Sequence, residues 1–362
     1  MAFLELKNVR IAGIAAGVPS HVASNLHPTD MDLMSSDYSP EAYVEATGVM
    51  ERRTSKTLTT ADLSYAAAER LITDLGWEKS EIGALVFVSQ TPDYLLPATA
   101  CILQDKLGLS KECMALDISL GCSGWVYGLS TVSSLLGKGV DKAILLAGDA
   151  KPVVLLDTDP REPLFGYAGT ATAVEFVEGE PGFKFHFGTD GSGFDAIITP
   201  DGGSRNPFNA DSIVKRNVNG LMKCRLQSVM DGMNVFSFGI STAPKTVKAL
   251  GKNFGFDYLD YDYFVFHQAN MKMNNMIVKK LKLDKEKVPS CMLHFGNTSS
   301  ASIPLTIVTQ LKGKVEDKPT KFICCGFGVG LSWGTVAFQN QNIVISELVE
   351  VSDEEADKKY VV

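Results

Sequence analysis

Short apolar segments alternate with amphipathic segments along most of this chain. Four runs rich in β-branched and aromatic residues end at Gly or a polar residue, which is typical of buried strands. They are Ala84–Ser89, Lys142–Gly148, Tyr263–His267 and Lys321–Gly326. Apolar residues at helical spacing predict helices over Thr60–Leu75, Gly124–Leu136, Val235–Leu250 and Met271–Leu283. Strands that alternate with helices indicate an α/β fold with an at least partly parallel sheet.

The chain changes character near its middle, where Gly and Pro cluster in residues 179–211. We place a boundary near residue 178, so that residues 1–178 and 179–342 form two halves. Each half then has a strand, a turn and a helix with a reactive side chain at the turn, which suggests a duplicated architecture. Residues 343–362 are expected to form a charged tail, since Glu347 to Lys359 is rich in Glu, Asp and Lys and is expected on or off the surface.

Composition narrows the possible functions. Of 362 residues, 45% are hydrophobic and 21% charged, as in ordinary globular proteins, and the net charge of −8 argues against general nucleic-acid binding. No apolar run approaches the roughly 18 residues that span a bilayer, and no signal peptide is visible. Seven cysteines without a Cys-x-x-Cys pair favour a reduced, cytoplasmic protein with no metal site.

The sharpest candidate for chemistry is Cys122, which lies in the turn Gly121-Cys122-Ser123-Gly124 between an apolar strand and a predicted helix. Small neighbours permit a tight turn that exposes the side chain. A helix N-terminus carries partial positive charge, so we expect a lowered thiol pKa and a more nucleophilic sulfur. The alternative is a small buried Cys in a Gly-rich turn.

Two further polar residues follow in the second half. His267 ends a predicted strand, and carboxyl ends of strands are where open α/β sheets place their sites. Asn297 lies in a turn of small residues before an apolar helix. The alternative to a catalytic role is a structural one for each residue. His267 would then be a hydrogen-bonded histidine at the end of a strand, and Asn297 would be a helix cap or turn residue. The Gly-rich loop Gly326–Gly334 offers backbone amides to a developing oxyanion.

The order of Cys122, His267, Asn297 and the final Gly-rich loop closely resembles β-ketoacyl-[acyl carrier protein] synthase III of the thiolase-like superfamily. The resemblance extends to about residue 339 and includes Thr47-Gly-Val-Met-Glu-Arg-Arg, Gln90-Thr-Pro-Asp and His267-Gln-Ala-Asn. It implies a thiolase-like fold, a duplicated five-layered αβαβα arrangement, and a homodimer without a cofactor.

The resemblance also implies roles for these residues. Cys122 would take an acyl group from a thioester, while His267 and Asn297 would stabilise the carbanion formed when malonyl-acyl carrier protein loses carbon dioxide. The backbone amides of Cys122 and Val329 would hold the tetrahedral oxyanion. Leu96 matches an acyl-pocket residue that reaches the partner subunit. The acidic carrier protein would dock on Lys272, with Lys279 and Lys280 extending the patch or forming an ordinary solvated face.

Some family features are missing. Ala42 and Ala46 stand where relatives that use coenzyme A carry Trp and Arg, and Arg161 is out of register with a further nucleotide-contacting Arg. These losses argue against coenzyme A as the acyl donor and favour an acyl carrier protein or another thioester. Val329 replaces a Gly of the family's terminal loop, which suggests a divergent paralogue with a specialised acyl product.

Two alternatives remain open beside decarboxylative condensation. The first is a non-decarboxylative acyltransferase on the same scaffold, and the second is a non-catalytic partner subunit of a condensing heterodimer.

Overall fold

The protein is described by a computed structural model over residues 2–27, 39–150, 162–218 and 221–356. Arg161 and the last residues of the expected tail lie outside these ranges. Within them, no helix combines the length and apolar character needed to cross a membrane.

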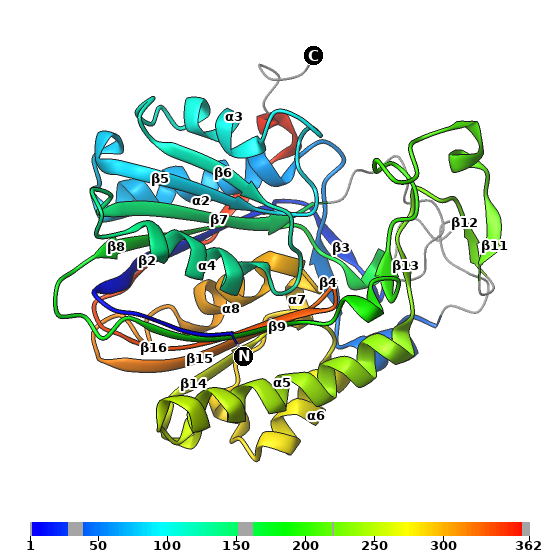
Figure 1. Ribbon diagram of the computed structural model, residues 1–362. Coiled ribbons are helices and arrows are strands. Elements are labelled where there is room, and N and C mark those ends of the chain that lie inside the picture. Colours follow the sequence, from blue (N-terminus) through cyan, green and yellow to red (C-terminus); the bar gives the residue numbers. More distant parts are fainter. Residues whose placement is uncertain (1, 28–38, 151–161, 219–220, 357–362) are drawn as a thin grey trace.

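Two β-sheets stack with helices between them and on both outer faces, which makes five layers (Figure 1). The first sheet has the order β17-β2-β8-β7-β5-β6, and β18 also pairs with β2. Its strands are β2 (Val9–Pro19), β5 (Ile82–Val88), β6 (Met114–Ile118), β7 (Lys142–Asp149), β8 (Ala168–Phe176), β17 (Val344–Ile345) and β18 (Val349–Val351). The second sheet has the order β1-β9-β16-β15-β14. Its strands are β1 (Ala2–Leu6), β9 (Phe183–Thr189), β14 (Tyr263–Phe266), β15 (Thr320–Gly328) and β16 (Ser332–Asn340).

Helices α4 (Gly124–Leu135) and α8 (Ser302–Leu311) fill the space between the sheets, while α2 (Thr60–Leu75) and α3 (Thr99–Lys106) cover the outer face of the first sheet (Figure 1). On the outer side of the second sheet lie α5 (Gly232–Phe254) and α6 (Met271–Leu281). Smaller helices are α1 (Pro40–Thr47) and α7 (Met292–Phe295). The thiolase-like five-layered fold is confirmed.

The hydrophobic pattern explains the layers. The largest core cluster lies between the sheets and includes Trp125, Phe185 and Leu305, and two further clusters lie under the outer helices. Helix α4 is apolar on several sides because both sheets bury it. Helix α2 begins with a capping box between Thr59 and Asp62.

The strands and helices expected from the sequence are confirmed to within a few residues at each end. Helix α2 has the predicted bounds, and α4 differs by one residue. The sheet is mixed, as expected: β5 pairs in parallel with β6 and β7, whereas β8 is antiparallel to β2 and β7.

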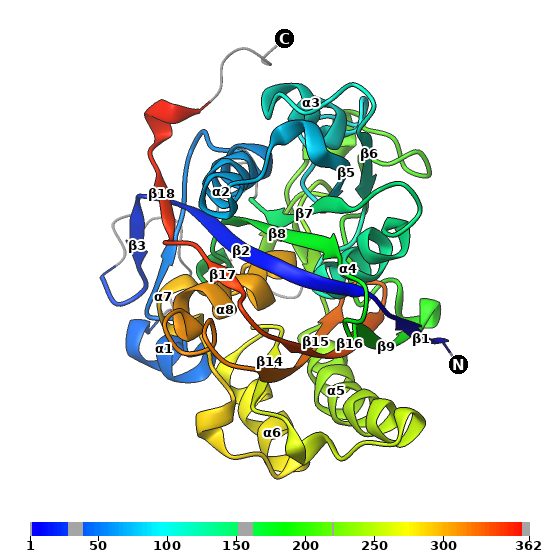
Figure 2. The ribbon, with the colours of Figure 1, turned by 90° about the vertical axis from the view of Figure 1, so that its left-hand side faces the viewer.

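The expected charged tail needs correction. Strands β17 and β18 pair in parallel with β2, and Ile345 and Val351 are buried, so both strands belong to the first sheet (Figure 2). Conversely, β1 from the chain's start pairs with β9 in the second sheet (Figure 2). The boundary near residue 178 lies in the connection between β8 and β9, but each sheet also receives strands from beyond that division.

Residues 190–218 and 221–230 leave the layers and form a lobe beside them, at right in Figure 1. The lobe contains two short antiparallel pairs: β10 (Ile197–Ile198) with β13 (Val229–Met230), and β11 (Arg216–Val218) with β12 (Leu221–Lys223). A further short antiparallel pair, from the N-terminal half of the sequence, joins β3 (Val22–Ser24) to β4 (Glu51–Arg53). The β10–β13 pair borders the cavity described next.

Candidate active site

Cys122 lies in the tight turn between β6 and α4. The Gly124 N–H donates to the Gly121 carbonyl at 2.7 Å, which closes the turn. A Cβ on Gly328 would lie 2.6 Å from the Cys122 Cβ and 2.7 Å from its Sγ, closer than carbon and sulfur atoms can approach. Glycine at position 328 is therefore required to leave room for the sulfur.

The electrostatic surroundings of Cys122 differ from our expectation. The pKa of the Cys122 thiol is raised to about 11, mainly by burial and also by the Asp149 carboxylate. The backbone amides of Val329 and Cys122 and the Ser299 side chain oppose this rise. The predicted lowering of this pKa is wrong, because removal of the sulfur from water outweighs the helix N-terminus. The resting nucleophile is a thiol, so acylation requires a proton acceptor.

His267 directly follows β14 and is 2% exposed. Its backbone N–H donates to the Cys325 carbonyl at 2.9 Å, and its Nδ1 is hydrogen-bonded to the Ser302 hydroxyl at 2.8 Å, which fixes the orientation of the ring. Burial lowers the pKa of His267 to about 3, partly opposed by a hydrogen bond to the backbone of Ser299. The imidazole is therefore neutral at physiological pH.

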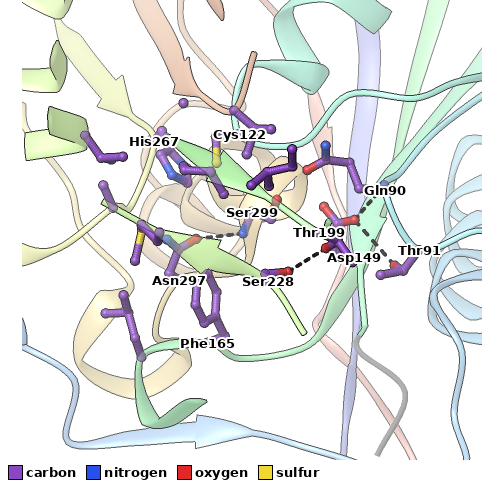
Figure 3. Close-up of a pocket in the computed structure, with 18 of the residues that line it drawn as sticks. Gln90, Thr91, Cys122, Asp149, Phe165, Thr199, Ser228, His267, Asn297 and Ser299 are labelled. Carbon is purple, nitrogen blue, oxygen red and sulfur yellow. Dashed lines mark hydrogen bonds between the residues drawn. The ribbon is translucent and has the colours of Figure 1, made fainter. Parts of the chain in front are cut away.

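Asn297 has a fixed orientation. Its Oδ1 accepts a hydrogen bond from the Ser299 N–H at 2.9 Å, so its amide NH₂ remains available to the cavity (Figure 3). Its backbone is held by the segment before β8: the Asn297 N–H donates to the Leu164 carbonyl at 2.8 Å, and the Gly166 N–H donates to the Asn297 carbonyl at 3.1 Å. A Cβ on Gly166 would lie 2.0 Å from the Phe295 carbonyl oxygen, so this close approach also requires glycine.

One cavity of about 600 Å³ brings the predicted residues together. Its lining includes Cys122, His267, Asn297 and Val329, from four separate segments of the chain (Figure 3). The Val329 amide contacts the Cys122 sulfur, as does the amide of Cys122 itself. Two backbone donors and two side-chain groups thus converge around one sulfur, an arrangement suited to acyl transfer and to stabilising an oxyanion.

The other predicted residues lie outside the cavity. Leu96 is 82% exposed and is not among the described residues that line the cavity. Lys272, Lys279 and Lys280 are exposed on α6, whose N-cap Asn270 lines the cavity, and Lys272 is the one nearest that end of the helix. Lys280 Nζ donates to the Ile240 carbonyl at 2.9 Å and points toward α5.

Asp149, Ser299 and Gln90 also line the cavity, and the sequence reasoning missed their involvement. Asp149 ends β7 at the same edge of the fold as the cavity. The rule that drew attention to His267, a polar residue at the carboxyl end of a strand, would also have selected Asp149. No comparable signal marks Ser299, whose position depends on the tertiary fold.

A duplicated αβαβα fold with a Cys, a His and an Asn around one cavity defines a thiolase-like condensing enzyme. Models of 3-oxoacyl-[acyl-carrier-protein] synthase III match residues 116–191, and models of its C-terminal part match residues 252–340. The β-ketoacyl-[acyl-carrier-protein] synthase III of Clostridium acetobutylicum is 31% identical over 92% of this chain and 99% of its own length. A synthase III of Geobacillus kaustophilus is also 31% identical, over 91% of this chain and 98% of its own.

Solved structures agree with this result. The 3-oxoacyl-(acyl-carrier protein) synthase of Burkholderia xenovorans has a TM-score of 0.89 at 37% identity and covers 97% of this chain and 99% of its own. The synthase III of Pseudomonas aeruginosa has a TM-score of 0.76 at 29% identity, over 95% of this chain and 100% of its own. The chain belongs to the β-ketoacyl-[acyl carrier protein] synthase III family, whose members are acyltransferases.

Proposed function

We propose that this protein condenses a Cys122-bound acyl group with a malonyl thioester carried by acyl carrier protein, releasing carbon dioxide. In the first half-reaction the Cys122 sulfur attacks the thioester carbonyl of a donor, and the donor thiol leaves with one proton. The tetrahedral oxyanion forms beside the amides of Cys122 and Val329. Both amides contact the sulfur, which supports their role as an oxyanion hole.

In the second half-reaction the malonyl thioester loses carbon dioxide and becomes an enolate, which attacks the acyl-Cys122 carbonyl and releases the Cys122 thiolate. Negative charge develops on the thioester oxygen in this step, so donors are needed there. The observation that carries the proposal is the orientation of Asn297. Because the Ser299 N–H donates to its Oδ1, the NH₂ group of Asn297 faces the cavity as a hydrogen-bond donor. A neutral His267, held at Nδ1, supplies the second group.

We further propose that the carrier protein docks beside α6. Lys272 and Lys279 are seven residues apart and lie on one face of the helix, since seven residues complete almost two turns. Lys280 is rotated away and engaged by the Ile240 carbonyl, so it contributes less. The exposed Ala42 on α1 offers no ring or charge to an adenine, which favours a carrier-bound donor over coenzyme A.

A homodimer and a cytoplasmic location complete the proposal. Leu95 and Leu96 are 93% and 82% exposed beside each other, which supports burial of this apolar pair against a partner subunit. In that dimer, Leu96 would complete the partner's acyl pocket. The seven cysteines are all free thiols, as a reduced compartment maintains them.

The decisive experiment measures carbon dioxide release from malonyl-acyl carrier protein by protein that carries an acyl group on Cys122. Wild type should release one equivalent per acyl group, and Cys122→Ala should remain unacylated by intact-mass analysis. Acyl transfer without carbon dioxide release would contradict the proposal and indicate the simple acyltransferase. A wild-type protein that is never acylated alone would indicate the non-catalytic subunit.

A further inference from the structure

Asp149 is a buried carboxylate at the end of β7 that faces the same cavity as Cys122. It is 9% exposed, and the roles proposed above leave it without a function. A buried carboxylate beside a thiol is costly, because it disfavours the thiolate that catalysis needs. Its position therefore requires a physical explanation.

The hydrogen bonds to Asp149 show that both of its oxygens act as acceptors. Oδ1 accepts from the Gln90 N–H at 2.8 Å and the Ser89 hydroxyl at 3.1 Å, and Oδ2 accepts from the Ser300 hydroxyl at 3.1 Å. The Ser300 N–H also approaches Oδ2, at 3.4 Å. A backbone N–H can only donate, so these partners favour the ionised carboxylate. Burial nevertheless raises the pKa of Asp149 above its usual value, which makes it a stronger base than an exposed Asp.

The side chain of Ser299 lies between Cys122 and Asp149 (Figure 3). Its hydroxyl lies close enough to both the Cys122 thiol and the Asp149 carboxyl to lower the pKa of each group. The hydroxyl also lies close to the nucleophile's turn, since a Cβ on Gly121 would be 3.2 Å from Ser299 Oγ. A hydroxyl can accept one proton while donating another, so it is a suitable bridge between a thiol and a carboxylate.

The backbone of Ser299 is strained, which indicates that its position matters. Its φ is +51°, in the left-handed region that a residue with a side chain rarely adopts. The Asn297 side chain accepts a hydrogen bond from its N–H at 2.9 Å and holds this conformation. The same contact thus orients the amide of Asn297 and the hydroxyl of Ser299.

We propose that the Cys122 thiol transfers its proton through the Ser299 hydroxyl to Asp149 when the sulfur attacks a thioester donor. The S–H bond breaks as the sulfur–carbon bond forms, Ser299 accepts the thiol proton and passes its own to Asp149. The leaving thiolate of the donor then recovers a proton by the reverse path. The exchange is balanced and needs no co-reactant. This inference rests on the acylation half of the proposed function, and not on decarboxylation.

His267 is the competing acceptor. Besides Asp149, the titratable residues in the described lining of the cavity are Cys122, Tyr167 and His267. Burial holds the pKa of His267 at about 3, whereas burial raises that of Asp149, so the carboxylate is the better acceptor. His267 then remains neutral throughout and is available as a hydrogen-bonding group for the enolate.

The test is the single-turnover rate at which Cys122 is acylated by acyl-coenzyme A and acyl-carrier-protein donors, followed by intact mass between pH 5 and 9. Ser299→Ala removes only the bridging hydroxyl, and we expect it to slow acylation by about 100-fold, as for loss of general base catalysis. Asp149→Asn should slow it similarly and remove the pH dependence due to the carboxylate, and Asp149→Glu should restore part of the rate. The matched control is Ser300→Ala, which also removes an Asp149 partner but not the bridge, and should have a much smaller effect.

A second measurement does not depend on any acyl donor. The pH midpoint for alkylation of Cys122 by iodoacetamide should fall in Asp149→Asn, because a nearby negative charge is lost. It should rise in Ser299→Ala, because a hydrogen bond to the thiolate is lost. Opposite shifts support the inference even if no donor acylates the protein.

Three results would overturn the inference: equal acylation rates in Ser299→Ala and wild type, equal losses in Ser299→Ala and Ser300→Ala, or unmoved alkylation midpoints in both bridge variants. Failure of the proposed function is seen separately. Wild-type protein that is acylated through the bridge but releases no carbon dioxide would refute condensation and leave this inference standing.

Discussion

Replacement of Asn297 by Asp tests the orientation of the carboxamide without changing its shape. In the native site the Ser299 N–H donates to Oδ1 at 2.9 Å, and an Asp oxygen accepts that bond equally well. The side chain should therefore stay in place. Its second terminal atom changes from an NH₂ donor to an oxygen acceptor, which faces the oxygen where the enolate charge develops.

The expected loss of rate in Asn297→Asp has two contributions. Loss of one oxyanion donor costs about 10²–10³-fold in rate, and Asn297→Ala should show this loss alone. In Asn297→Asp, a carboxylate about 4 Å from the developing charge adds repulsion of up to about 4 kcal/mol at an effective dielectric constant of about 20. Even a third of that repulsion is a further tenfold, so Asn297→Asp should be slower than Asn297→Ala by about tenfold or more.

The assay is carbon dioxide release from malonyl-acyl carrier protein by protein acylated beforehand on Cys122. Intact mass measures the acylation step separately, and both variants should still be acylated, because Asn297 acts in the second half-reaction. If Asn297→Asp releases carbon dioxide as fast as Asn297→Ala, the amide does not face the enolate oxygen, and our assignment of its orientation is wrong.

Three further predictions follow from single contacts. Gly328→Ala should abolish acylation of Cys122 with the fold retained by circular dichroism, because the new Cβ would lie 2.7 Å from the sulfur; normal intact-mass labelling would contradict this. Because the pKa of His267 is about 3 in the folded protein and about 6.5 when unfolded, the unfolded chain binds the proton first as pH falls. The free energy of unfolding should then decrease between pH 6.5 and 3, by up to about 5 kcal/mol, and His267→Gln should show a smaller loss in urea titrations. Lys272→Glu should raise KM for the carrier-protein substrate by about tenfold with little change in kcat, whereas equal effects of Lys280→Glu would argue against docking at the start of α6.

Local sequence patterns were sufficient to predict the helices and strands and to identify the principal site residues. The bounds of α2 follow from a capping box at one end and a glycine at the other, signals contained within a few neighbouring residues. Cys122, His267 and Asn297 were found because each lies in a turn next to a strand or a helix, where chemistry is usually placed. Their order along the chain was enough to indicate the family.

The features that the sequence did not predict depend on long-range packing. The segment with Ile345 and Val351 reads as a charged tail, yet it completes the first sheet because β2 offers it a free edge, which no local pattern reveals. The helix N-terminus suggested an acidic Cys122 thiol, but burial among the surrounding layers raises its pKa to about 11. Asp149 and Ser299 are 150 residues apart in sequence and line the same cavity as Cys122 only in the folded protein. Interactions with neighbours in the chain can be read from a sequence, whereas desolvation and contacts between distant segments depend on how the layers stack.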